Sequence, residues 1–159
     1  MRRQDKYPNT WCFQYHNENP KNRFTGDCVF RAISTALEKS WETVVMEMAT
    51  LSCENGYSVS SKENIDRYLK LNGWEKQKQP RKADNTKYTG KEFCQVLQRW
   101  LDHCDELEIL GSEWEDGIII DRRIIAMIGG HHIISIVDGK VWDTWNSTDG
   151  CIGNYWIRF

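Results

Sequence analysis

The chain has 159 residues and a mass of 18.8 kDa, which fits one domain with a sizeable core. Hydrophobic residues make up 40% of the sequence and charged residues 28%, a balance that excludes wholesale disorder. The net charge of −2 gives no global attraction to nucleic acid, and no apolar run approaches the roughly 20 residues that cross a bilayer. We therefore expect a globular protein that enters no membrane and does not bind nucleic acid.

Six cysteines raise the question of disulfides or a metal site. The residues after Met1 lead into no apolar stretch, so we expect no secretion signal and a cytoplasmic protein with free thiols. No two cysteines have the Cys-x-x-Cys spacing of a zinc knuckle, and we expect no metal centre and no cofactor. A zinc set built from Cys12-x3-His16 with Cys94 and Cys104 remains open as an alternative.

The first two thirds of the chain carry helical patterns. Residues 1–26 are polar and rich in turn residues, so we expect an irregular segment there. Apolar residues surround most of the run 28–37, which favours a buried helix capped by Thr25 or Asp27. Apolar stripes and capping patterns indicate three more helices: residues 41–51, a segment from Ser60-x-x-Glu63 to Asn72-Gly73, and a segment from Thr89-x-x-Glu92 to Cys104.

The last third of the chain contains short β-rich runs: Ile118–Ile120, Ile124–Ile128, Ile133–Val137, Lys140–Thr144 and Tyr155–Arg158. Helices first and strands afterwards predict an α+β protein whose antiparallel sheet packs on the helical half. We expect one domain over residues 1–159, irregular in 1–26, mainly helical in 27–104 and mainly β in 117–159.

Charge is unevenly distributed along the sequence. Residues 70–91 contain seven Lys or Arg against two acidic residues, and residues 102–116 contain seven acidic residues and no basic one. One interpretation is two solvated surfaces that partly neutralise each other. The other is that Lys78, Arg81 and Lys82 form a docking surface for an acidic partner.

Cys28 follows Gly26-Asp27 and begins the most apolar predicted helix. The helix N-terminus favours the thiolate, and Gly26 leaves room for a substrate, although most free cysteines are merely small buried hydrophobes. A nucleophilic thiol also needs a base and a residue that orients the base. The oxyanion hole would combine the backbone N–H of Cys28 with one side-chain donor from three unranked candidates: Gln14, Asn19 and Asn22.

Asp138-Gly139 lies between two predicted strands and is typical of a two-residue hairpin turn. The resulting register makes His132 and Asp143 diagonal neighbours on one face, roughly 7–8 Å apart. A carboxylate at that place would orient the imidazole and stabilise its charged form. In the same register His131 lies opposite Asn146, and a change of one residue in the turn would favour this alternative pair.

The pattern resembles papain-like cysteine peptidases, in which a cysteine begins the central helix and a histidine and an acidic or amide residue follow on later strands. Residues 26–33, Gly-Asp-Cys-Val-Phe-Arg-Ala-Ile, are similar to the nucleophile motif Asp-Gly-Asn-Cys-Leu-Phe-Arg-Ala of ovarian-tumour-type deubiquitinases. Two positions depart from that family. Thr25 stands where the motif has Asp, and Ile134 stands where the family commonly has its acidic residue.

Three longer strings resemble small proteins encoded by phages and prophages that look like compact relatives of the papain fold: residues 19–28, 79–84 and 132–145. This resemblance implies a single papain-like domain that acts in the cytoplasm of a bacterial host. It also implies that Cys28, His132 and Asp143 are the site residues, the same three that the hairpin register selects.

Our leading hypothesis is a thiol hydrolase that cleaves a peptide or isopeptide bond with Cys28, His132 and Asp143. The expected substrate is a protein or peptide, either a conjugated ubiquitin-like tail or a viral or host protein with one processing site. The alternative is a phage-encoded binding or inhibitor protein that blocks a host factor without catalysis, through the basic loop. A nucleic-acid binder using that loop would show a steep salt dependence, and the net charge argues against it.

Overall fold

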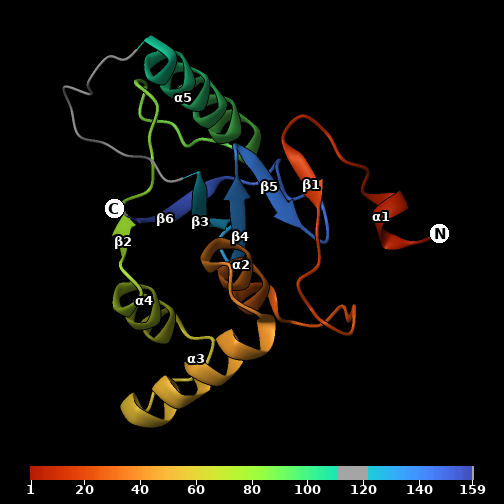
Figure 1. The fold of residues 1–159 in the computed structure, drawn as a ribbon, viewed down its shortest axis with the longest axis vertical. Coiled ribbons are helices and arrows are strands. Elements are labelled where there is room, and N and C mark those ends of the chain that lie inside the picture. Colours follow the sequence, from red (N-terminus) through yellow and green to blue (C-terminus); the bar gives the residue numbers. More distant parts are fainter. Residues whose placement is uncertain (111–121, 159) are drawn as a thin grey trace.

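The computed structural model describes residues 1–110 and 122–158, with the side chains of residues 104–110 left out. The helices are α1 (Arg3–Lys6), α2 (Cys28–Leu37), α3 (Trp41–Asn55), α4 (Lys62–Leu71) and α5 (Gly90–Leu110) (Figure 1). The strands are β1 (Phe13–Tyr15), β2 (Trp74–Gln77), β3 (Arg123–Ile128), β4 (His132–Val137), β5 (Lys140–Asp143) and β6 (Ile152–Arg158). The strand expected over Ile118–Ile120 lies outside what is described, as do residues 111–116 of the acidic segment 102–116.

The sheet is mixed, so the prediction of a purely antiparallel sheet is wrong. Its strand order is β1-β5-β4-β3-β6-β2, and β1 runs parallel to β5 while the other pairs are antiparallel. Both edge strands come from outside the β-rich third: β1 lies in the segment expected to be irregular, and β2 lies between two helices. Each is only three or four residues long, too short for an alternating pattern to reveal it.

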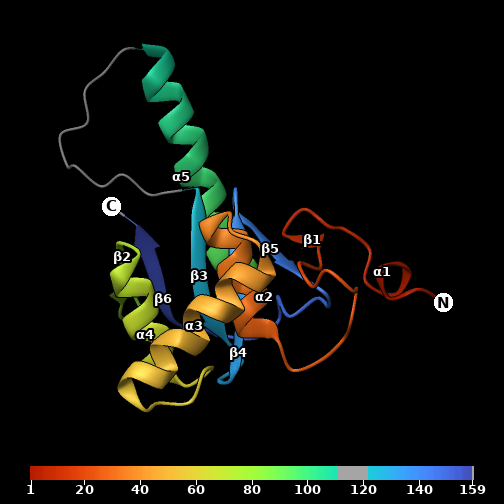
Figure 2. The ribbon, with the colours of Figure 1, turned by 60° about the horizontal axis from the view of Figure 1, so that its bottom comes forward.

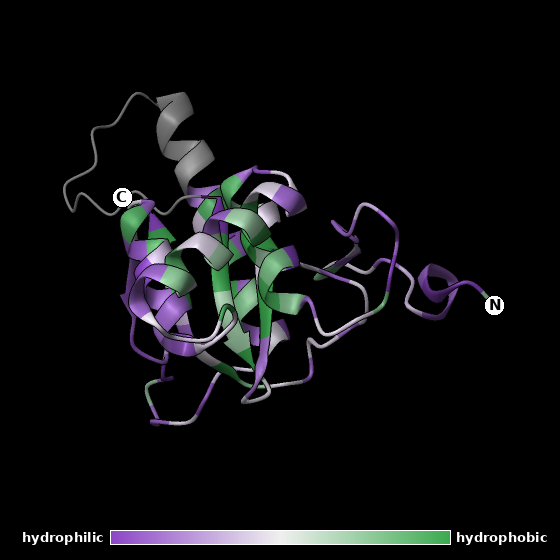
Figure 3. Ribbon diagram, turned by 90° about the horizontal axis from the view of Figure 1, so that it is seen from below, coloured by the Kyte–Doolittle hydropathy of each residue, from purple (hydrophilic) through white to green (hydrophobic). Residues whose placement is uncertain are grey.

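Helices cover both faces of the sheet. Figure 1 shows α5 above the strands and α2, α3 and α4 below them, and Figure 2 shows the same separation from another side. One buried cluster joins α2, α3 and α4 to the sheet and includes Ile33, Met48 and Ile125. A second cluster under α5 includes Leu97 and Ile134. Hydrophobic residues accordingly concentrate in the strands and on the helices beside them, as Figure 3 shows.

The β4–β5 hairpin has the predicted register. Ile136 pairs with Val141, and the two residues of the turn, Asp138 and Gly139, have φ values of 49° and 74°. Two consecutive positive φ angles are typical of the tight turns that match the twist of a hairpin. His132 is therefore the first residue of β4, and Asp143, the last residue of β5, lies at the same end of the sheet.

The helix N-termini differ in how their free backbone N–H groups are satisfied. The predicted capping box at α5 is confirmed, because Thr89 and Glu92 each accept the other's backbone N–H. Helix α4 begins one residue later than expected, because the Ser61 hydroxyl accepts the N–H of Asn64. Asp27 occupies the N-cap position of α2, as expected, but its side chain makes no capping hydrogen bond. The carboxylate of Asp27 instead belongs to the candidate site.

Candidate active site

Cys28 is the first residue of α2, and its half-buried thiol lies within reach of hydrogen bonds from the imidazole of His132 and the backbone N–H of Ile133. Burial by itself raises the pKa of this thiol. The two hydrogen bonds and the charges of His132 and Arg31 outweigh burial, so that the pKa of Cys28 is lowered from its ordinary value of 9.0. The thiolate, which is the nucleophilic form, is thereby favoured.

His132 links this thiol to a carboxylate. Its Nε2 atom is hydrogen-bonded to Oδ2 of Asp143, which leaves Nδ1 as the ring nitrogen available to Cys28. Burial lowers the pKa of His132, but the hydrogen bonds to Asp143 and Cys28 outweigh it and raise the pKa from 6.5 to about 9. The site therefore favours a thiolate and an imidazolium in contact.

Asp143 is held by buried donors. Its Oδ1 atom accepts a hydrogen bond from Nη1 of Arg31 at 2.7 Å and from the backbone N–H of Thr144 at 2.7 Å. Asp143 is only 3% exposed and Arg31 9% exposed, so each charge needs the other as its partner. Because Oδ1 is held by these two donors, Oδ2 is fixed in place to accept from His132 and can orient its ring.

Arg31 connects the site to the start of α2. Its Nε atom donates to Oδ1 of Asp27 at 2.9 Å, and Oδ2 of Asp27 accepts from Nδ2 of Asn19 at 3.0 Å and Nε1 of Trp41 at 3.1 Å. Sequence reasoning missed Arg31 and Asp27 as positioning residues. An arginine inside an apolar helical run, four residues after an aspartate, is the signal that would have indicated a buried ion pair.

Two of the three side chains proposed as oxyanion donors bind other groups. Nδ2 of Asn19 donates to Asp27, and Nε2 of Gln14 donates to the carbonyl of Tyr15. Asn22 is exposed, in a turn with a φ of 52°. Among the described residues, none of the three candidates lines the cleft at Cys28. The backbone N–H of Cys28 remains a donor there, because the first N–H groups of a helix have no partner within it.

The alternative pair is not brought together. His131 is exposed in the turn between β3 and β4. Oδ1 of Asn146 accepts from the backbone N–H and the hydroxyl of Thr148, at 3.1 Å and 2.5 Å, and so stabilises its own turn. The register of the hairpin thus selects His132 with Asp143.

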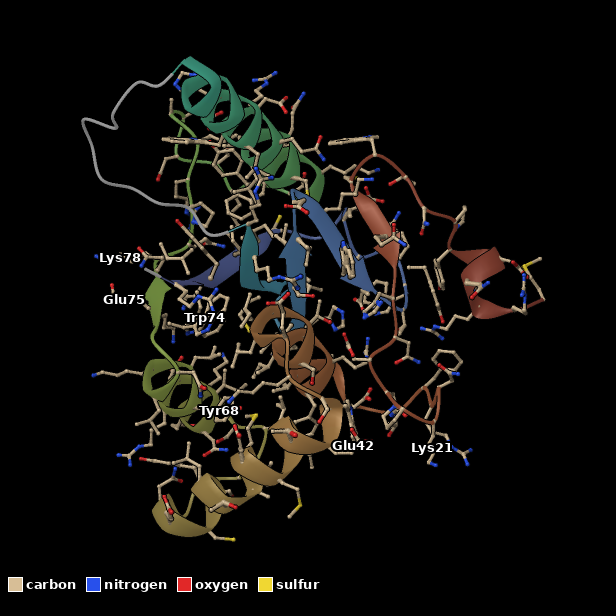
Figure 4. The ribbon with its side chains drawn as sticks, viewed as in Figure 1. Lys21, Glu42, Tyr68, Trp74, Glu75 and Lys78 are labelled. Carbon is tan, nitrogen blue, oxygen red and sulfur yellow. The ribbon has the colours of Figure 1, made fainter. Side chains whose placement is uncertain are left out.

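The basic loop, which contains Lys78, Arg81 and Lys82, follows the edge strand β2. Figure 4 shows Lys78 beside β2, far from the N-terminal loop that carries Lys21, and β1 and β2 are opposite edge strands. Arg81 donates to the side chain of Gln79 and the carbonyl of Asn85, and Lys82 is paired with Glu92. Arg81 thus binds within its own loop and Lys82 binds to α5, whereas Lys78 is exposed.

Two adjacent hollows meet at His132. The first, here called the Cys28 cleft, has a volume of about 340 Å³ and is lined by Cys28, His132 and Trp145 together with residues of the N-terminal segment. The second, the Gly150 cleft, has a volume of about 330 Å³ and is lined by His132, Trp145 and Gly150 but not by Cys28. The ring of Trp145 lies 5.0 Å from that of His132 and borders both clefts.

The described cysteines are free: Cys12, Cys28, Cys53, Cys94 and Cys151. No group of three or more metal-ligating side chains is found among the described residues, and in the proposed zinc set His16 is hydrogen-bonded to Glu18. The side chain of the fourth candidate ligand, Cys104, lies outside the described part. No described helix is both long and apolar enough to cross a membrane.

Comparison of the chain with protein-family models, with curated proteins and with solved structures finds no match.

Proposed function

We propose that this protein is a thiol hydrolase of papain-like architecture that cleaves a peptide or isopeptide bond. The observation that carries the proposal is the chain of contacts from Cys28 through His132 to Asp143, at the border of two clefts. A thiol of lowered pKa next to an imidazole of raised pKa is the arrangement that acyl transfer to sulfur requires.

In the proposed reaction, the Cys28 thiolate attacks the carbonyl carbon of the substrate. The negative charge moves to the carbonyl oxygen, where the backbone N–H of Cys28 stabilises it. The imidazolium of His132 then gives its proton to the leaving amine, and the C–N bond breaks to leave a thioester on Cys28. Neutral His132 next removes a proton from water, the hydroxide attacks the thioester, and the carboxylic acid product leaves as the thiolate and imidazolium are restored.

The substrate class follows from resemblance rather than from geometry. The similarity of residues 26–33 to deubiquitinase motifs supports a conjugated ubiquitin-like tail, and the similarity of three strings to phage-encoded proteins supports a viral or host protein as substrate. Action in the bacterial cytoplasm belongs to the same proposal.

Selective alkylation tests this proposal. The protein is treated with iodoacetamide near neutral pH, and mass spectrometry follows each cysteine over time. We expect Cys28 to react at least about tenfold faster than the exposed Cys53 and Cys151. This advantage should be lost in His132→Ala and kept in His131→Ala, the exposed neighbouring control. Equal labelling of the three thiols would contradict the proposal and favour a binding protein that blocks a host factor.

A further inference from the structure

The Cys28 cleft carries a concentration of positive charge that the composition of the chain does not explain. Three arginines line it, Arg3, Arg23 and Arg31, and the lining contains no Asp or Glu among the described residues. The chain as a whole has a net charge of −2. Arg31 already forms ion pairs with Asp27 and Asp143. Arg3 and Arg23 are therefore the two arginines of the cleft that can bind a ligand.

Arg3 is held in place on the cleft by contacts that leave part of its guanidinium available. Its Nε atom donates to the carbonyl of Thr144 at 2.7 Å, and its guanidinium carbon lies 4.7 Å from the ring centre of Phe24. Thr144 directly follows Asp143, so this contact ties α1 to the site. Within the described part of the chain, no acceptor is found for Nη1 or Nη2 of Arg3. A guanidinium fixed through Nε still presents two donors to an anion.

Arg23 is attached to the same network through its backbone. Its N–H donates to Oδ1 of Asn19 at 3.3 Å, and the other end of that amide is bonded to Asp27. The guanidinium of Arg23 has no acceptor among the residues that the structure describes. An exposed cation on the same cleft as Cys28, with no ion pair to a described residue, is suited to contact a substrate rather than to stabilise the fold.

The two clefts have different roles if Cys28 forms the acyl-enzyme. The acyl group becomes bonded to Cys28, so it must occupy the cleft that this residue lines. The leaving amine takes its proton from His132, and the Gly150 cleft is lined by His132 without Cys28. Arg3 and Arg23 therefore lie on the acyl side of the scissile bond.

We propose that the Cys28 cleft selects peptides with an Asp or Glu side chain on the acyl side of the scissile bond, bound by Arg3 and Arg23. This inference rests on the proposed function and adds a substrate class to it. A carboxylate matches the two-donor geometry of a guanidinium, and the exposed rings of Phe24 and Trp145 line the same cleft.

A binding experiment tests this selectivity apart from turnover. Fluorescent alanine-based peptides carry one Glu at each acyl-side position in turn, and matched peptides carry Gln there. Their affinity for Cys28→Ala is measured by anisotropy at low salt. The best Glu peptide should bind at least about tenfold more tightly than its Gln partner, because a charge-assisted pair replaces a neutral one. The difference should shrink with added salt.

Substitutions of arginine test which residues bind the Glu side chain of the peptide. Arg23→Gln, and Arg23→Gln combined with Arg3→Gln, should reduce the Glu preference stepwise, whereas Arg67→Gln, an exposed arginine on α4, should keep it. Circular dichroism checks that each variant is folded. Equal affinity for Glu and Gln peptides, no binding of either, or an oligonucleotide that displaces the Glu peptide at lower concentration would overturn the inference. If Glu peptides bind through the arginines but wild-type protein forms no thioester with them, the proposed function fails and the recognition stands.

Discussion

The N-terminal backbone N–H groups of α5 are capped by side chains, whereas those of α2 have no side-chain cap. The first N–H groups of any helix lack partners within it. At α5, Thr89 and Glu92 close over these groups with two reciprocal hydrogen bonds. At α2, the N-cap Asp27 turns its carboxylate to Arg31 and makes no capping bond. Helices α3 and α4 are capped by serines, so α2 differs from the other three long helices.

This difference leaves the start of α2 without a side-chain cap, and it lets Asp27 position Arg31 instead of stabilising the helix. Its open N–H groups and the positive end of its dipole are directed at the residue that begins the helix, Cys28. The carboxylate that would have capped it instead holds Arg31, and Arg31 holds Asp143. The cost of leaving one helix uncapped is about 1 kcal/mol, small enough for the rest of the core to offset.

The largest expected effect is that of Asp143→Asn. An amide has one acceptor oxygen, whereas Asp143 accepts from both Arg31 and His132 through separate oxygens. We expect the rate of thioester formation to fall by roughly 10²–10⁴-fold and the pKa of His132 to fall from about 9 toward 6.5. Stopped-flow acylation and histidine NMR measure these two quantities. Asp138→Asn, in the exposed turn, is the control, and equal rates in the two variants would contradict the assignment.

The next largest effect concerns the ion pairs at α2. Arg31→Met leaves two buried carboxylates, Asp27 and Asp143, without their shared cation. We expect the free energy of unfolding to decrease by roughly 3–5 kcal/mol. Chemical denaturation measures it, and Arg67→Met should change it by less than about 0.5 kcal/mol because Arg67 is exposed on α4. A small change at Arg31 would contradict the claim that Asp27 and Asp143 depend on this shared cation.

The pH dependence of hydrolysis should have two limbs. Because the pKa of His132 is raised to about 9, the imidazolium persists below that pH and is lost above it. Because the pKa of Cys28 is lowered from 9.0, the thiolate is present below that pH and disappears only when the pH falls through the lowered value. Activity should therefore fall about tenfold per pH unit on each side of the plateau. A rate that keeps rising above pH 9, as for an unassisted thiol, would count against the pair.

The smallest effect sharpens the contrast between the two helix ends. Thr89→Ala removes the hydroxyl that caps α5 and should lower the free energy of unfolding by about 1 kcal/mol. The rate of Cys28 alkylation should not change, since none of the described contacts of Cys28, His132 and Asp143 involves α5. Thermal unfolding and alkylation, measured on the same sample, check both statements. A slower alkylation would show that the two ends are coupled.

Local patterns in the sequence predicted much of the site. The turn at Asp138-Gly139 fixed the register that makes His132 and Asp143 neighbours, and this register is confirmed. The range predicted for the helix at Cys28 is also confirmed. Both follow from interactions between residues close in sequence, where turn geometry and helical periodicity determine the outcome.

Other features depend on contacts that no local pattern encodes. Strand β1 pairs in parallel with β5, more than a hundred residues away in sequence. Alternation along β4 places His132 on the same face of the sheet as Ile134, which packs under α5. The thiol of Cys28 nevertheless comes from α2, which covers the opposite face. The site forms because His132 and Asp143 end their strands, and Arg31 of α2 reaches Asp143 there. Arg31, His132 and Asp143 come together only when the whole sheet is assembled.

The most direct measurement is the ultraviolet absorbance of the Cys28 thiolate against pH, taken as the difference between wild-type protein and Cys28→Ala. The midpoint should lie below 9.0 in the wild-type background and move upward in His132→Ala, because the imidazolium stabilises the thiolate. A midpoint at or above 9.0 that does not respond to the loss of His132 would contradict the assignment of Cys28 as an activated nucleophile.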